Sequence, residues 1–100
     1  MKSMLSSREK FNAESIGVSG MLWQTQEECG ELVKAIGKYN RTRGLGQKTE
    51  VSKEDAYYNL IEEITDVEIC IDQLKFLLNL DSSVVRDCKV NKVYNRYRKG

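Results

Sequence analysis

The chain contains neither histidine nor proline among its 100 residues. Without histidine, general-base catalysis by an imidazole and nucleophile systems of the Ser/His or Cys/His type are excluded. Without proline, helices can run far along the chain before anything interrupts them. Apolar runs fall short of the roughly 20 residues that a membrane span needs, and the first residues lack the apolar centre of a signal peptide. We therefore expect a cytoplasmic protein with no membrane partner.

Cysteine is sparse, and charge of one sign does not dominate. Cys29, Cys70 and Cys88 are odd in number and lie in helical patterns, which favours reduced, packed thiols over disulfides or a zinc site. Sixteen basic and fifteen acidic residues give a net charge of +1, so nucleic acid is not an expected partner. A chain this short buries its surface poorly, which favours a homodimer or homotetramer.

Helical periodicity fills most of the chain. It predicts long helices over residues 19–42 and 53–79 and a shorter helix over 83–98. The glycine-containing stretch 43–52 is expected to be a loop. We treat residues 1–100 as one domain whose first 18 residues are partly flexible, with a short helix before Gly17 and loose chain over 1–7. The predicted fold is all-α: two long antiparallel helices plus a C-terminal helix, completed by oligomerisation.

Each long helix carries an apolar stripe, and we expect the two stripes to form the core. The stripe of the first helix consists of Leu22, Cys29, Leu32, Val33, Ile36 and Tyr39. The stripe of the second consists of Leu60, Ile64, Val67, Ile71, Leu74 and Leu78. Trp23, near the start of the first helix, is more typical of a core or subunit contact than of stacking on a base.

Two pairs of acidic residues flank these stripes. Glu28 and Glu31 on the first helix, and Glu63 and Asp66 on the second, are each spaced by three, so both carboxylates of a pair lie on one face. Acidic flanks are usually only solvated surface, but here the pattern recurs on both long helices. Four converging carboxylates repel one another unless a divalent cation lies between them. The sequence therefore predicts a site for Mg²⁺, which Mn²⁺ can replace.

The acidic segments resemble a known family. Glu28-Cys-Gly-Glu31-Leu and Glu63-Ile-Thr-Asp66-Val are similar to the ExxE…ExxD signature of the MazG-like, all-α nucleoside triphosphate pyrophosphohydrolases, over about residues 20–80. The resemblance implies hydrolysis of a (deoxy)nucleoside triphosphate to a monophosphate and pyrophosphate, with these four carboxylates as magnesium ligands and catalytic residues. The interval between Glu31 and Glu63 is longer than is usual in the family, and we assign the extra length to the loop.

Basic and amide side chains for the phosphate tail are expected at the end of the first helix and on the last helix. The candidates are Lys38, Arg41, Lys92, Asn95 and Arg98. Lysine and arginine bind phosphate oxygens through charge-assisted hydrogen bonds. A solvated basic face is the simpler explanation for any one of them, and the last three match the family's set only approximately.

Two alternatives stay open on the sequence. One is an enzyme like phosphoribosyl-ATP pyrophosphohydrolase, which the same scaffold supports, although its Ser-Tyr-Thr and Tyr-His segments are missing here. The other is a non-catalytic helical interaction or regulatory module, whose basic last helix contacts nucleic acid or an acidic protein. In such a module the four carboxylates need not converge.

Overall fold

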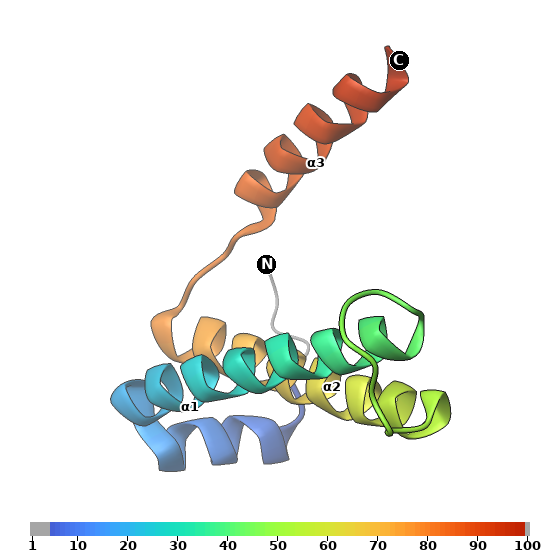
Figure 1. The fold of residues 1–100 in the computed structure, drawn as a ribbon. Coiled ribbons are helices and arrows are strands. Elements are labelled where there is room, and N and C mark those ends of the chain that lie inside the picture. The colour runs from blue at the N-terminus through green and yellow to red at the C-terminus, as the bar shows by residue number, and fades with distance from the viewer. Residues whose placement is uncertain (1–4, 100) are drawn as a thin grey trace.

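Three helices account for most of the chain. A computed structural model describes residues 5–99 and contains α1 (Ser7–Thr42), α2 (Lys53–Leu78) and α3 (Ser83–Arg98), with no strand in that range (Figure 1). The all-α fold predicted from the sequence is thus confirmed. None of the described helices combines the length and the apolar character that crossing a membrane requires.

A capping box starts α1. The Ser6 hydroxyl accepts a hydrogen bond from the Glu9 amide at 3.2 Å, and the Glu9 carboxylate accepts one from the Ser6 amide at 3.2 Å. These bonds satisfy amides that would otherwise lack a partner in the first turn. The helix therefore starts at Ser7, with Ser6 as its cap, whereas loose chain was expected over residues 1–7; residues 1–4 lie outside the described range.

Gly17 divides α1 into two segments. Its backbone, with φ 83° and ψ 169°, is far from helical and lies in a region that favours glycine. The first segment, residues 7–16, folds back against α2, where the Gln73 side-chain amide donates a hydrogen bond to the Glu9 carbonyl at 3.0 Å. The Lys10 ammonium lies 5.8 Å from the centre of the Phe76 ring. The sequence correctly predicted a short helix before Gly17.

The second segment of α1 and α2 form an antiparallel pair joined by a loop (Figure 1). Ser52 caps the start of α2, since its hydroxyl accepts a hydrogen bond from the Asp55 amide at 3.1 Å. At the other end Asn79 adopts a left-handed conformation, φ 49° and ψ 46°, and its amide bonds to the Lys75 and Phe76 carbonyls. This turn ends α2 and directs the chain away from the pair.

The interface of the pair differs from the predicted core. The buried residues are Met21, Ala35, Ala56, Val67, Cys70 and Gln73, together with Ala13 of the first segment. Most are small, and Met21 is the largest fully buried side chain among the described residues. Small side chains let the helices approach along a line next to the predicted stripes. Six members of those stripes keep between 38% (Ile71) and 70% (Val33) of their surface exposed, and Trp23 is 65% exposed rather than in the core.

α3 stands apart from the pair. Among the described residues it makes no contact with α1 or α2, and Figure 1 shows it projecting away from them. The radius of gyration, 17.0 Å, exceeds the roughly 13 Å of a closely packed chain of this length. The start of α3 is capped by the Asp81 carboxylate, which accepts a hydrogen bond from the Ser83 amide at 2.9 Å. The Ser82 side chain makes no cap bond. The bonds from Ser83 lower the pKa of Asp81 from 3.8 to about 2.

Candidate metal centre

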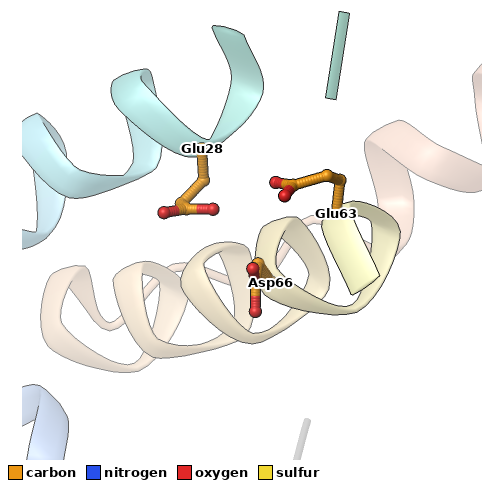
Figure 2. Close-up of side chains that lie close together, drawn as sticks. All are labelled: Glu28, Glu63 and Asp66. Atoms are coloured by element: carbon orange, nitrogen blue, oxygen red, sulfur yellow. The ribbon is translucent and has the colours of Figure 1, made fainter. Parts of the chain in front are cut away.

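Three of the four predicted ligands converge where the two helices of the pair cross. Glu28 of α1 and Glu63 and Asp66 of α2 each offer a carboxylate oxygen, and these oxygens lie within 4.8 Å of one another. Figure 2 shows Glu28 and Glu63 pointing toward one another, with Asp66 on the next turn of α2. Glu28 and Glu63 are half-buried and Asp66 is exposed. We call these three residues the acidic cluster.

Glu31 lies outside the acidic cluster. Its carboxylate is exposed and accepts a hydrogen bond from the Lys34 ammonium at 3.5 Å, an ion pair within α1. Three residues along a helix turn the side chain by about 300°, so Glu31 lies about 60° around α1 from Glu28. That rotation is enough to place one residue of the pair in the interface and leave the other facing solvent.

The Glu63 carboxylate carries an unsatisfied oxygen. Its Oε2 atom is buried and has no hydrogen-bond partner among the described residues. Burying a charged oxygen without a partner is costly, and native proteins satisfy such groups by a hydrogen bond, an opposite charge or a metal ion. Glu28 and Asp66 cannot supply the missing partner while they are ionised, since carboxylates only accept hydrogen bonds. A cation bound among the three carboxylates would fit this oxygen.

The pKa of Glu28 is raised by burial and by the other carboxylates nearby. Burial raises the pKa of its carboxyl above the ordinary value of 4.5, and the nearby charges of Asp66, Glu63 and Glu31 raise it further. Each of these effects disfavours the ionised form. Without a cation, the folded chain therefore holds its carboxylates against mutual repulsion.

A small open pocket adjoins the acidic cluster. It is lined by Gln24, Glu28, Asp66, Ile69 and Cys70. Burial, followed by the charge of Glu28, raises the pKa of the Cys70 thiol, which keeps it neutral and a poor metal ligand. The sequence indicated no role in the site for Gln24, Ile69 or Cys70.

The three cysteines differ in their surroundings. All three are free thiols, as expected, but only Cys70 is packed in the interior. Cys29 and Cys88 are exposed, so the prediction of packed thiols is wrong for these two. Cys29 belongs to an apolar stripe that the pair leaves at its surface.

The predicted phosphate-binding residues lie in two separate places. Lys38 is exposed and Arg41 is half-buried, both toward the end of α1, and Lys38 lies two turns beyond Glu31 on the same stripe. Lys92, Asn95 and Arg98 are on α3, where the Arg98 guanidinium donates a hydrogen bond to the Asn95 side-chain oxygen at 3.4 Å. Because α3 contacts neither helix of the pair, one copy of the described chain does not bring these three to the acidic cluster.

No protein-family model, curated protein or solved structure matches the chain. The acidic cluster and the motifs in which its residues occur are therefore the features that indicate a function.

Proposed function

We propose that the protein hydrolyses a (deoxy)nucleoside triphosphate to a monophosphate and pyrophosphate in a Mg²⁺-dependent reaction. The observation that carries the proposal is the acidic cluster, in which three carboxylates from two helices converge and the Oε2 atom of Glu63 is buried without a hydrogen-bond partner among the described residues. The resemblance of the two acidic segments to the MazG-like signature supports the choice of substrate. A non-catalytic module gives no reason for carboxylates from separate helices to converge.

The donor set fits magnesium. Mg²⁺ binds carboxylate oxygens, keeps several of its waters and binds substrate phosphates, whereas soft or nitrogen ligands favour other metals. Glu28, Glu63 and Asp66 would hold the ion, and it would supply positive charge to the phosphate oxygens around the bond that breaks. Cys70 stays outside the ligand set because its thiol is neutral.

Other residues of the chain have separate roles in this proposal. Glu31 is near the acidic cluster but outside it, so its carboxylate is available to accept a hydrogen bond from the attacking water. Lys38, on the same stripe of α1, provides a positive charge for the phosphate tail. Removal of Lys38 as Lys38→Ala should raise KM more than it lowers kcat, since it weakens binding before the reaction begins.

A matched pair of variants tests the activity. A panel of nucleoside triphosphates is incubated with the protein and Mg²⁺, and release of pyrophosphate is measured. Glu63→Gln should abolish release because it removes a charged ligand, while Glu62→Gln, which changes an exposed neighbour, should leave it unchanged. Absence of release from every triphosphate, or equal effects of the two variants, would contradict the proposal.

A binding measurement separates the metal site from the reaction. A ligand that binds only the folded state raises the melting temperature by mass action. Mg²⁺ should therefore stabilise the wild type and Glu62→Gln, and stabilise Glu63→Gln much less. If Mg²⁺ stabilises none of the three, the acidic cluster is not a metal site.

A further inference from the structure

The α1–α2 pair leaves an extended apolar surface uncovered. Residues on it recur every seven positions on both helices, a period typical of helices that pack against other helices. We call this surface the apolar face; it consists of Leu22, Cys29, Val33 and Ile36 on α1 and Tyr57, Ile64, Ile71 and Leu78 on α2. All eight side chains are exposed.

The two halves of the apolar face lie on the same side of the pair. Leu22 directly follows the buried Met21 on α1, and Ile71 directly follows the buried Cys70 on α2. One residue turns a helix by about 100°, so both exposed stripes are rotated from the interface in the same sense. Because the helices are antiparallel, the same sense of rotation leads to the same side of the pair.

The first segment of α1 does not cover this face. It contacts α2 through Gln73, which lies about 200° around the helix from Ile71, on nearly the opposite side. In Figure 1 the first segment, coloured blue, runs along one side of the pair, and α3 rises on the other. α3 is therefore on the side of the apolar face but does not contact it.

The apolar face is large enough for a stable dimer. Its seven side chains other than Cys29 are each 38–70% exposed. At roughly 150–200 Å² for a large side chain, they expose on the order of 600 Å² per copy. Two such faces in contact would bury about 1,200 Å², within the range of specific interfaces and above that of most crystal contacts. An exposed area of this size is at the upper end of the range for the largest apolar patch on a soluble monomer, and such patches are often functional.

Charge selects a second copy of the same chain as the partner. α2 carries seven acidic and two basic side chains, whereas α3 carries five basic and one acidic. These opposite charges do not meet within one copy, because α3 contacts neither α1 nor α2. α3 also exposes an apolar stripe of its own, Val90, Val93, Tyr94 and Tyr97. With a net charge of +1, two copies have almost no overall repulsion to overcome.

We propose that a second copy of this chain covers the apolar face with its own, forming a four-helix bundle in which α3 of each copy lies against α2 of the other. The arrangement buries the uncovered stripes and joins the acidic helix to the basic one. It also gives α3 the packing that a 16-residue helix needs, since isolated helices of about this length are marginal in water. The inference is independent of the proposed hydrolysis.

Sedimentation velocity of the full chain over a range of concentrations tests the dimer. The wild type should sediment as a species of twice 11.5 kDa. Ile71→Glu places a charge in the centre of the apolar face and should weaken the dimer at least tenfold. The matched control Phe11→Glu places the same charge on an exposed residue of the first segment and should leave the dimer intact. A wild type that stays at 11.5 kDa at every concentration overturns the proposal.

Thiol reactivity identifies the face without any substitution. Cys29 lies in the apolar face, whereas Cys88 lies on the side of α3 away from its apolar stripe; both are exposed. As protein concentration rises, alkylation of Cys29 should slow and alkylation of Cys88 should not. A dimer in which Cys29 reacts as fast as in dilute protein would show that a different surface forms the contact. This readout remains decisive if Ile71→Glu fails to fold.

A charge reversal tests the placement of α3. Lys89 and Arg96 lie on one stripe of that helix, outside the residues expected to bind phosphate. The double variant Lys89→Glu/Arg96→Glu should weaken the dimer several-fold at low salt and less at high salt, because screening reduces the contribution of exposed charges. A dimer that is unaffected by this change would show that α3 is not part of the interface and that only the apolar faces form it.

Discussion

The α1–α2 pair and α3 differ in what holds each of them in place. The pair has a buried interface that includes Met21 and Cys70, a side-chain hydrogen bond from Gln73 to the first segment, and capped helix starts. α3 has none of these contacts with the pair; within the described residues it has an Asp81 cap and local bonds such as Arg98 to Asn95.

This difference in packing affects the predicted metal ligands and the predicted phosphate-binding residues in different ways. Carboxylates expected to hold a metal are placed by the pair, so their geometry is a property of one folded copy. Three of the residues expected to bind phosphate, Lys92, Asn95 and Arg98, are on α3, so their placement depends on what α3 packs against. A helix pattern specifies which residues share a face, but it does not specify which surface that face will meet.

The largest expected effect contrasts Glu28 with Glu31, two members of one motif. Glu28→Gln removes a residue of the acidic cluster and should lower kcat/KM by more than the roughly 100-fold typical of a lost outer-shell partner. It should also abolish stabilisation by Mg²⁺. Glu31→Gln should lower kcat while that stabilisation stays intact, because Glu31 is outside the cluster. Loss of the Mg²⁺ effect in Glu31→Gln would restore it as a ligand.

Core and surface truncations compare the pair with α3 directly. Met21→Ala should destabilise the protein by about 2–5 kcal/mol, because Met21 is fully buried and its loss leaves a cavity. Val84→Ala changes a residue of α3 that is 75% exposed and should cost no more than about 0.5 kcal/mol. Urea unfolding of both variants gives the values. A Val84→Ala effect as large as that of Met21→Ala would show that α3 is packed at Val84.

The pH dependence of stability probes repulsion within the acidic cluster. The pKa of Glu28 is raised in the folded state, so the folded carboxyl holds its proton more tightly than the unfolded one. Its contribution to metal-free stability is complete below pH 4.5 and is lost as pH rises through the raised pKa. Mg²⁺ should offset this loss by neutralising the cluster.

Melting temperatures over pH with and without Mg²⁺ measure this effect, and two glutamines provide the comparison. Glu28→Gln should flatten the metal-free profile, whereas Glu27→Gln, at an exposed neighbour, should retain it. Metal-free stability that rises with pH in this range, in the wild type and not in Glu28→Gln, would mean that the ionised Glu28 is stabilised by a partner.

The smallest effect is confined to the start of α3. Asp81→Ala removes the hydrogen bond to the Ser83 amide and should increase hydrogen exchange in the first turn of α3 without changing exchange in α1 or α2. Ser82→Ala is the matched control, because the Ser82 side chain makes no cap bond. Since the pKa of Asp81 is lowered to about 2, the cap persists above pH 3.8 and is lost only as pH falls through about 2. Spread of the exchange into α2 would show that the two helices are coupled.

Much of the fold could be predicted from the sequence because its signals are local. The helix starts at Lys53 and Ser83 and the break at Gly17 depend on residues within a few positions of each event. The rotation of the helices could not be predicted. Either flank of each apolar stripe could have been buried, and the structure buries the flank that carries small residues such as Ala35 and Ala56.

The same limit applies to the acidic cluster. The recurrence of the spacing of three on both long helices predicted that the two acidic pairs converge, and the structure brings Glu28, Glu63 and Asp66 together. Whether Glu31 joins them depends on about 60° of helix rotation, which no spacing specifies. The Oε2 atom of Glu63 lacks a hydrogen-bond partner because none of its neighbours among the described residues offers a donor. Those neighbours come from different parts of the chain, so a local sequence pattern could not predict this.

The hydrogen bond from Gln73 to the Glu9 carbonyl also has a consequence for the order of folding. It joins residues 64 positions apart, whereas α1 and α2 meet first near a short loop that closes at little entropic cost. Because contacts distant in sequence form more slowly, the hairpin of the second α1 segment and α2 should assemble first. The first segment would then swing about Gly17 and dock last, when Gln73 is already in position to receive it. Early formation of the Glu9–Gln73 contact in pulse-labelled hydrogen exchange would contradict this order.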